Sequence, residues 1–263
     1  MALLTFLTDF GTSDYYVAAV KGTVLRLAPG SQIVDITHEI PSGDVATGAF
    51  LLAASVPWFP EGTVHLAVVD PGVGSRRRIL VARTDAGWLV LPDNGLLTLL
   101  HLRGAVRSIR SVEKTGVFLP GPGQTFHGRD RFAPVAAWLL RREPVETLGP
   151  EISDPVLLPL ERPRREPGSI SGQVVHVDRY GNLITDIPSG WLPEGLCRAE
   201  VAGRSVTLRA GHYAEIPDGI EGEEGEAAMI PGSLGTVELS LKGDDLARKW
   251  IVERGASIRI TWL

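Results

Sequence analysis

The sequence predicts an α/β fold, with an N-terminal α/β domain around a largely parallel central sheet and a small C-terminal domain of β-strands. Two observations carry this prediction. Strand-like and helix-like segments alternate with short loops over residues 1–158, the pattern of a parallel sheet covered by helices. After residue 168 the segments become short, β-rich and separated by Gly, Pro or Asp, as in a small barrel or sandwich.

The elements of the first domain follow from its apolar runs and their end signals. Strands are expected at 3–8, 32–37, 63–69, 79–83 and 88–91, the last two joined by a hairpin turn. Helices are expected at 15–27, 44–56, 95–102 and 129–142. Asp44 stands where the second helix begins, so it is the expected N-cap.

A linker is expected between the domains. Residues 159–168 contain three prolines, a glycine and five charged residues, a composition that suits no packed element. The domains are therefore placed at 1–158 and 169–263. In the second domain the acidic segment 221–226 is expected to be a solvated loop, and strands are expected at 170–177, 183–187, 198–202, 205–209, 236–241 and 257–262.

Composition excludes several classes of protein. The 263 residues are 44% hydrophobic and 22% charged, which is ordinary for a globular chain, and no apolar run is long enough to span a bilayer. The net charge of −5 argues against a nucleic-acid or anionic-membrane partner. The N-terminus lacks the basic start of a signal peptide, and the lone Cys197 excludes an internal disulfide and a cysteine-based zinc site. We expect a cytoplasmic protein.

Two residue counts are informative. Arginine outnumbers lysine by 22 to 4, and Asn94 and Asn182 are the only asparagines. Depletion of thermolabile amides fits a thermophilic source, and a genome rich in G and C explains the same counts equally well. Under either explanation asparagine is disfavoured, so the two that remain are candidates for a specific role.

Polar stretches of the first domain fall at the ends of expected strands and before a helix. Ligands of open parallel sheets bind beyond the carboxyl ends of the strands. Asp9 and Asp14 lie in T-D-F-G-T-S-D, and Asp70 begins D-P-G-V-G-S-R-R-R, where a neighbouring arginine would keep its carboxylate ionised. The alternatives are a turn that caps the next helix and a solvated basic turn.

Two further motifs belong to the same domain. Asn94 lies in P-D-N-G, which by itself is a turn signal, and His127 lies in F-H-G-R-D on a loop before a helix. His127 with Asp9 and Asp70 could hold a metal ion. Because no paired-histidine motif accompanies them, we expect no metal site.

Two turns of the second domain carry the remaining candidates. Asp178, Tyr180 and Asn182 belong to D-R-Y-G-N, and Ser233 and Glu238 belong to P-G-S-L-G-T-V-E. An aromatic ring beside amide and hydroxyl groups suits a planar nitrogen heterocycle, which stacks on its face and hydrogen-bonds at its edge. The alternative for each is a plain hairpin turn.

Together these stretches resemble the S-adenosyl-L-methionine hydroxide adenosyltransferases, or adenosylmethionine hydrolases, a family once described as domain of unknown function 62 and similar to fluorinases and chlorinases. The resemblance runs from residue 7 to about residue 242. It implies an N-terminal α/β domain and a C-terminal β-barrel domain. It also implies a homotrimer whose active sites form between one subunit's N-terminal domain and the next subunit's C-terminal domain.

The resemblance also implies roles for the candidate residues. Asp70, Arg77 and His127 would form the catalytic triad, and Asp9 would hold the ribose hydroxyls. The other substrate-binding candidates are Asn182, Ser233 and Glu238 at the adenine, Tyr180 stacking on it, Asp14 and Asp178 at the methionine end, and Asn94.

The sequence departs from the halogenases at positions that bear on the nucleophile. Asp70 stands where they carry a tyrosine, and Gly128 where the fluorinase carries a halide-contacting serine. Gly43 replaces a tryptophan that packs on the substrate, and Tyr16 replaces a serine. These differences favour water over halide. Gly232 stands where the family usually carries an asparagine, directly before Ser233.

The expected reaction is hydrolysis of S-adenosylmethionine to adenosine and L-methionine. The substrate is a sulfonium ion, so its thioether leaves as a neutral group when water attacks the ribose C5′ opposite the sulfur. Asp70 would orient the water while Arg77 and His127 hold Asp70 in place. S-Adenosylmethionine is then a substrate, and neither cofactor nor metal is expected. The alternatives are a halogenase, a sensor that binds adenosine or S-adenosylmethionine without chemistry, and a metal-dependent hydrolase.

Overall fold

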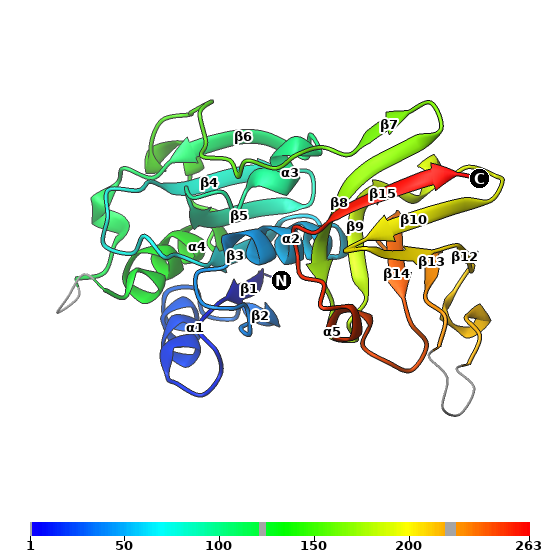
Figure 1. Ribbon diagram of the computed structural model, residues 1–263. Coiled ribbons are helices and arrows are strands. Elements are labelled where there is room, and N and C mark those ends of the chain that lie inside the picture. Colours follow the sequence, from blue (N-terminus) through cyan, green and yellow to red (C-terminus); the bar gives the residue numbers. More distant parts are fainter. Residues whose placement is uncertain (1, 121–124, 219–224) are drawn as a thin grey trace. The chain divides into compact units, whose positions relative to one another are not determined.

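The computed structural model describes residues 2–120, 125–218 and 225–263 (Figure 1). Internal contacts divide the chain into two compact units, Met1–Pro159 and Leu160–Leu263. The described part of the first unit contains a six-stranded sheet in the order β2-β1-β3-β5-β4-β6. Its strands are β1 (Leu3–Thr8), β2 (Gln32–Thr37), β3 (Thr63–Val68), β4 (Ile79–Thr84), β5 (Gly87–Pro92) and β6 (Val106–Ser111).

Four neighbouring strands of this sheet are parallel. β2, β1, β3 and β5 pair in parallel, whereas β4 pairs antiparallel with both β5 and β6. The expected parallel-rich α/β sheet is therefore confirmed, and so is the hairpin between β4 and β5. Strand β6 was not expected, because its sequence V-R-S-I-R-S mixes apolar residues with arginine and serine and lacks an apolar run.

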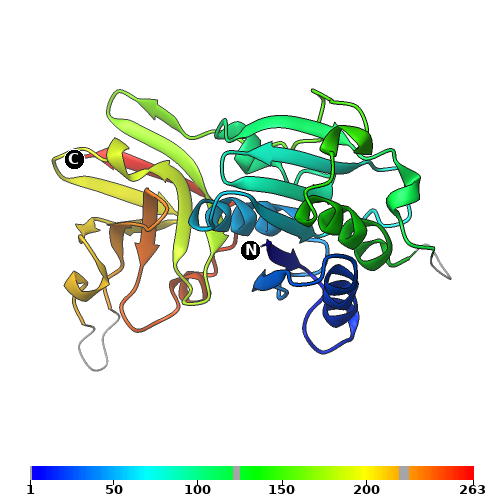
Figure 2. The same cartoon turned by 180° about the vertical axis from the view of Figure 1, so that it is seen from behind.

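Helices cover both faces of the sheet, as the two opposite views show (Figures 1 and 2). Side chains alternate between the faces of a strand, so Phe6 packs in the core formed with α1 (Tyr16–Leu27) and α4 (Ala133–Leu140). The next residue, Leu7, packs in the core formed with α2 (Val45–Ser55) and α3 (Thr98–Leu102). Apolar packing on both faces explains why β1 and β3 are nearly continuous hydrophobic runs.

The helix ends differ from the expected ranges in ways that have local causes. Asp44 caps α2 as expected, its carboxylate accepting the Thr47 amide at 3.1 Å. No side chain caps α1, which begins after Tyr15. The helix expected from residue 95 begins at Thr98, because Gly95 has a φ of 108°. The segment expected as one helix from 129 begins with a π-helical turn at Gly128–Phe132.

The second unit is built on β-strands, as expected. Its described residues form a barrel-like nine-stranded sheet in the order β11-β10-β15-β8-β9-β14-β13-β12, with β7 paired to β8. The sheet encloses its own apolar core. The strands are β7 (Arg164–Glu166), β8 (Ser169–Val177), β9 (Leu183–Pro188), β10 (Cys197–Val201), β11 (Arg204–Val206), β12 (Leu208–Arg209), β13 (Ala228–Pro231), β14 (Thr236–Ser240) and β15 (Ser257–Trp262).

Several details of this unit correct the sequence expectations. Residues 159–168, expected to hold no packed element, contain β7, an exposed three-residue edge strand that gains its order from backbone pairing and has no apolar pattern. The strand expected at 205–209 is two short strands, and β13 and α5 (Leu246–Trp250) were not expected. Most of the acidic segment 221–226 lies outside the described residues.

Short 3₁₀ turns complete the two units. They lie at Val56–Trp58, Thr115–Val117, Val145–Leu148, Ser189–Trp191 and Tyr213–Glu215. No helix in the described ranges is long and apolar enough to cross a membrane.

Candidate active site

Asp70 follows the fully buried strand β3, at the carboxyl end of the parallel part of the sheet. The turn Asp70–Gly74 reverses the chain, with the Val73 amide donating to the Asp70 carbonyl at 3.2 Å. This reversal brings Arg77 back onto Asp70. Arg77 Nε donates to Asp70 Oδ1 at 2.6 Å, and Arg77 Nη2 donates to Oδ2. The pair is a bidentate, charge-assisted contact between two nearly buried side chains.

His127 contacts the same guanidinium group from the turn before α4. Arg77 Nη2 lies 3.0 Å from His127 Nδ1. Because a guanidinium has only donors, Nδ1 must accept, and the single ring proton is on Nε2. Burial lowers the pKa of His127, and the charges of Arg131 and Arg77 lower it further against the opposing effect of Asp70 and Asp130. His127 is therefore neutral near pH 7 and holds Arg77, which in turn holds Asp70.

The packing around this triad explains two local residue choices. The Arg77 guanidinium lies over the Phe132 ring, 5.1 Å from its centroid. A Cβ on Gly128 would lie 3.2 Å from the Phe10 ring, so glycine lets the loop carrying His127 pass close to the loop after β1. The structure thus joins the three predicted triad residues from separate segments in one continuous contact.

Arg78, the last arginine of the R-R-R run, points elsewhere. Arg78 Nε donates to Asp93 Oδ2 at 2.6 Å, and its Nη1 donates to Asp154 at 2.9 Å. Asp93 precedes Asn94, whose Nδ2 donates to the Val69 carbonyl at 2.8 Å. Asn94 therefore ties the D-N-G turn to the residue just before Asp70.

Asp9 and Asp14 lie on the loop after β1. Asp9 Oδ2 accepts the Gly43 amide at 2.8 Å, which is the single hydrogen bond of this carboxylate with the described residues. Gly43 has a φ of 74° and its Cβ position would lie 3.5 Å from Pro71, next to Asp70. Asp9 thus belongs to the same loop cluster as Asp70. Asp14 is exposed and makes no hydrogen bond with the described part of the chain.

The D-R-Y-G-N turn of the second unit is a closed hydrogen-bonded loop. Asp178 Oδ1 accepts the amides of Tyr180 and Asn182 at 2.8 and 2.9 Å. Asp178 Oδ2 accepts Asn182 Nδ2 at 2.9 Å, so the carboxylate orients the buried asparagine amide. Tyr180 carries its ring outward and is 76% exposed.

Tyr213 joins this turn to Glu238 and was not found by sequence reasoning. Asn182 Nδ2 lies 3.3 Å from the Tyr213 hydroxyl, which donates to Glu238 Oε1. Ser240 Oγ donates to the same carboxylate oxygen at 3.2 Å. Burial raises the pKa of Glu238 against the lowering effect of its two hydroxyl donors. No motif marks Tyr213, because its role depends on residues 31 and 25 positions away.

Ser233 is exposed and makes no hydrogen bond with the described residues. Its neighbour Gly232 lies against Glu238, since a Cβ there would be 2.8 Å from Oε2. This close approach explains glycine at 232. Among residues 2–120, 125–218 and 225–263, no group of three or more His, Cys, Asp or Glu side chains is arranged to hold a metal ion.

Comparisons with known proteins bear on this site. Residues 4–149 match the model of the SAM hydroxide adenosyltransferase N-terminal domain, and residues 172–259 match that of the C-terminal domain. The chain belongs to the SAM hydroxide adenosyltransferase family. The two family domains fall within the two compact units.

Named relatives match along nearly the whole chain. The chain is 38% identical to an (R)-S-adenosyl-L-methionine hydrolase of Salinispora tropica, covering 98% of this chain and 97% of the relative. It is also 38% identical to an (R)-S-adenosyl-L-methionine hydrolase of Thermus thermophilus, and the match covers 97% of this chain and 98% of the relative. A fluorinase of Actinopolyspora mzabensis is more distant, at 25% identity, and the match covers 98% of this chain and 97% of the fluorinase.

A solved structure matches the adenosyltransferase fold of this chain. The crystal structure of an uncharacterized conserved protein from Thermotoga maritima has a TM-score of 0.89 and 32% identity. The match covers 98% of this chain and 99% of that one.

Proposed function

We propose that the protein hydrolyses S-adenosyl-L-methionine to adenosine and L-methionine. The single observation that carries the proposal is the continuous contact from Asp70 through Arg77 to His127, beside the Asp9 loop. The names of the two 38% identical relatives agree with it, and the fluorinase relative is more distant. A carboxylate held in this way suits the orientation of water.

The reaction balances without a redox partner. Water attacks the ribose C5′, the C5′–O bond forms, and the C5′–S bond breaks with its electron pair passing to the sulfonium sulfur. One proton leaves the attacking water and is released to the solvent, so the sulfonium ion and water give adenosine, methionine and one proton. The substrate already carries the positive charge that makes the thioether a good leaving group, so the mechanism calls on no metal or cofactor.

Asp70 orients the water in this mechanism. Arg77 occupies one lone pair on each carboxylate oxygen, and the remaining lone pairs can accept a hydrogen from water. A water molecule aligned opposite the C–S bond avoids part of the entropic barrier of encounter. Arg77 keeps the carboxylate in one orientation, and neutral His127 keeps Arg77 in place by accepting from Nη2.

The remaining candidate residues bind the substrate in this proposal. Asp9 holds the ribose hydroxyls, Asn182, Ser233 and Glu238 contact the adenine, and Tyr180 stacks on it. Asp14 and Asp178 hold the methionine end. Since three of the roughly four lone pairs of Asp178 are used in its turn, only one is left for substrate. Asn94 acts indirectly, by holding the main chain just before Asp70.

The proposed assembly is a homotrimer in the cytoplasm, with each site formed by the first unit of one subunit and the second unit of the next. The candidate residues are divided between the two compact units, and a site shared between subunits would bring the two sets together.

Asp70→Asn tests the proposed chemistry. The amide keeps the side-chain volume but loses the charge pairing with Arg77, so turnover should fall by about 10²–10⁴-fold. Adenosine binding should stay within about threefold, since Asp70 acts on water. Chromatography of S-adenosylmethionine incubations measures turnover, and calorimetry measures adenosine binding.

The same chromatography separates the rival functions. Wild-type protein should form adenosine and methionine in the presence or absence of chloride and fluoride. A 5′-halo-adenosine product would indicate a halogenase. Binding without any product would indicate a sensor, and full turnover by Asp70→Asn would remove Asp70 from the mechanism.

A further inference from the structure

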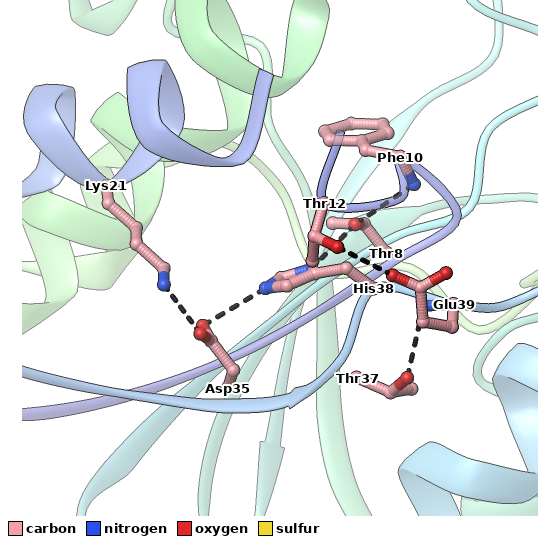
Figure 3. A network of polar contacts seen from close by, with 8 residues as sticks. All are labelled: Thr8, Phe10, Thr12, Lys21, Asp35, Thr37, His38 and Glu39. Atoms are coloured by element: carbon pink, nitrogen blue, oxygen red, sulfur yellow. Dashed lines mark hydrogen bonds and ion pairs between the residues drawn. The ribbon is translucent and has the colours of Figure 1, made fainter. Parts of the chain in front are cut away.

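The loop that carries Asp9 is joined to the loop after β2 by several hydrogen bonds (Figure 3). Thr8 Oγ1 lies 2.8 Å from His38 Nδ1, and the Gly11 amide donates to the His38 carbonyl at 2.7 Å. Thr12 Oγ1 donates to Glu39 Oε1 at 3.1 Å. The residues on both sides of Asp9 are therefore held by His38 and its neighbour.

The direction of the Thr8–His38 hydrogen bond follows from its surroundings. Lys21 Nζ lies 2.5 Å from Asp35 Oδ2, and Asp35 Oδ1 lies 3.1 Å from His38 Nε2 (Figure 3). The second contact lacks hydrogen-bond geometry but places negative charge beside Nε2. That charge favours the ring proton on Nε2, which leaves Nδ1 to accept the Thr8 hydroxyl hydrogen.

Thr8 also acts on the backbone beside Asp9. Its Oγ1 accepts the Phe10 amide at 3.2 Å, so one hydroxyl bridges the His38 ring and the peptide that follows Asp9. Asp9 itself makes one side-chain hydrogen bond with the described residues, to the Gly43 amide. The direction of its other carboxylate oxygen therefore depends on how firmly this backbone is held.

We propose that Thr8 and His38 are positioning residues for substrate binding, acting through Asp9. The inference rests on the proposed function, in which Asp9 accepts the ribose hydroxyls. Thr8, buried in β1, and His38, buried after β2, hold the Asp9 loop in the orientation that the ribose needs. Their loss should weaken binding of the nucleoside more than it slows the chemical step at Asp70.

The chain supplies a matched control for this proposal. Three residues earlier in the same strand, Thr5 Oγ1 lies 2.8 Å from His65 Nδ1, and both side chains are buried. This is the same kind of hydrogen bond between threonine and histidine. It lies inside the sheet, between β1 and β3, and holds no loop of the candidate site.

The test compares Thr8→Val with Thr5→Val in the full-length protein. Each substitution removes one buried hydroxyl from the same strand. Thr8→Val should raise KM for S-adenosylmethionine and Kd for adenosine by about tenfold, with kcat within about threefold. Thr5→Val should change neither constant by more than about twofold. Thr8→Ser, which keeps the hydroxyl, should restore both.

Two results would overturn the proposal. One is that Thr8→Val has the same KM for S-adenosylmethionine and the same Kd for adenosine as Thr5→Val. The other concerns the double variant with Asp9→Asn: the free-energy effects of Thr8→Val and Asp9→Asn on Kd would simply add. A residue that acts through Asp9 should instead have little further effect once Asp9 is changed. If wild-type protein binds adenosine but turns over no S-adenosylmethionine, the proposed function fails while the Kd comparison still tests Thr8. Wild-type protein that does neither would overturn both.

Discussion

Arg77 connects the two other members of the triad because of its planar, forked guanidinium. Nε and Nη2 face the two oxygens of Asp70, and Nη2 also reaches His127. A lysine ammonium, which is a single point of charge, could not hold a carboxylate in this bidentate geometry. One side chain therefore sets the orientation of Asp70 and requires the neutral form of His127.

This requirement predicts a pH dependence. The pKa of His127 lies below its ordinary value of 6.5, mainly because of burial. Protonation would place a hydrogen on Nδ1 against Arg77, so kcat should be level near pH 7–8 and fall as the pH drops below 6.5. His127→Asn, which can accept but does not titrate in this range, should lack this decline. Initial rates across pH measure both, and a decline centred above 6.5 would contradict the assignment.

The same shift affects stability. Because the folded-state pKa of His127 is lowered, the unfolded chain binds a proton more readily once the pH falls below about 6.5. The contribution of neutral His127 to folding is therefore present above that pH. It decreases as the pH falls from there toward the lower folded-state value.

At the scale of elements, Asp9 and Asp70 lie on loops that follow buried strands. β1 leads to Asp9 and β3 leads to Asp70, and both strands are held in the sheet by parallel pairing to each other. The α2 N-terminus adds Gly43, which contacts Asp9, and Asp44, which caps the helix. Rigid elements thus set the position of loops whose own residues are polar.

Asp44→Ala tests the contribution of this helix end. Loss of the cap at Thr47 should lower the free energy of unfolding by about 1 kcal/mol, and Asp44→Ser should retain most of it. Urea denaturation followed by circular dichroism measures the difference. Equal midpoints for the alanine and serine variants would show that the cap is not the stabilising interaction.

At the scale of the whole molecule, the candidate residues fall in two separate units. The triad and Asp9 belong to Met1–Pro159, whereas Asn182, Tyr213 and Glu238 belong to Leu160–Leu263. Each set is held by hydrogen bonds within its own unit. This division gives the proposed trimer with shared sites a direct test.

Subunit mixing is that test. Asp70→Asn should inactivate the contribution of the first unit and Asn182→Ala that of the second, so each variant alone should have little activity. Co-expressed, the two should form mixed oligomers in which intact halves meet, and part of the wild-type activity should return. Product chromatography and light scattering measure activity and assembly. Mixed oligomers without recovered activity would contradict a site shared between subunits.

Local sequence patterns were sufficient for the elements and residues that depend on near neighbours. Buried strands such as β3 appear as apolar runs, Asp44 stands at its helix start, and Asp70 follows a strand end. The strands β6, β7 and β13 and the helix α5 were missed, because their order comes from pairing and packing with distant segments.

The sequence by itself determined the α/β and β-rich units and the residue types at the candidate site. The family resemblance already singled out Arg77 among the three arginines, and only the tertiary structure decided that His127 reaches Asp70 through Arg77 and that His38 holds Thr8. Tyr213 beside Asn182 is a further case. The physical reason is that a hydrogen bond between side chains tens of residues apart leaves no local pattern, since its geometry exists only after the chain has folded.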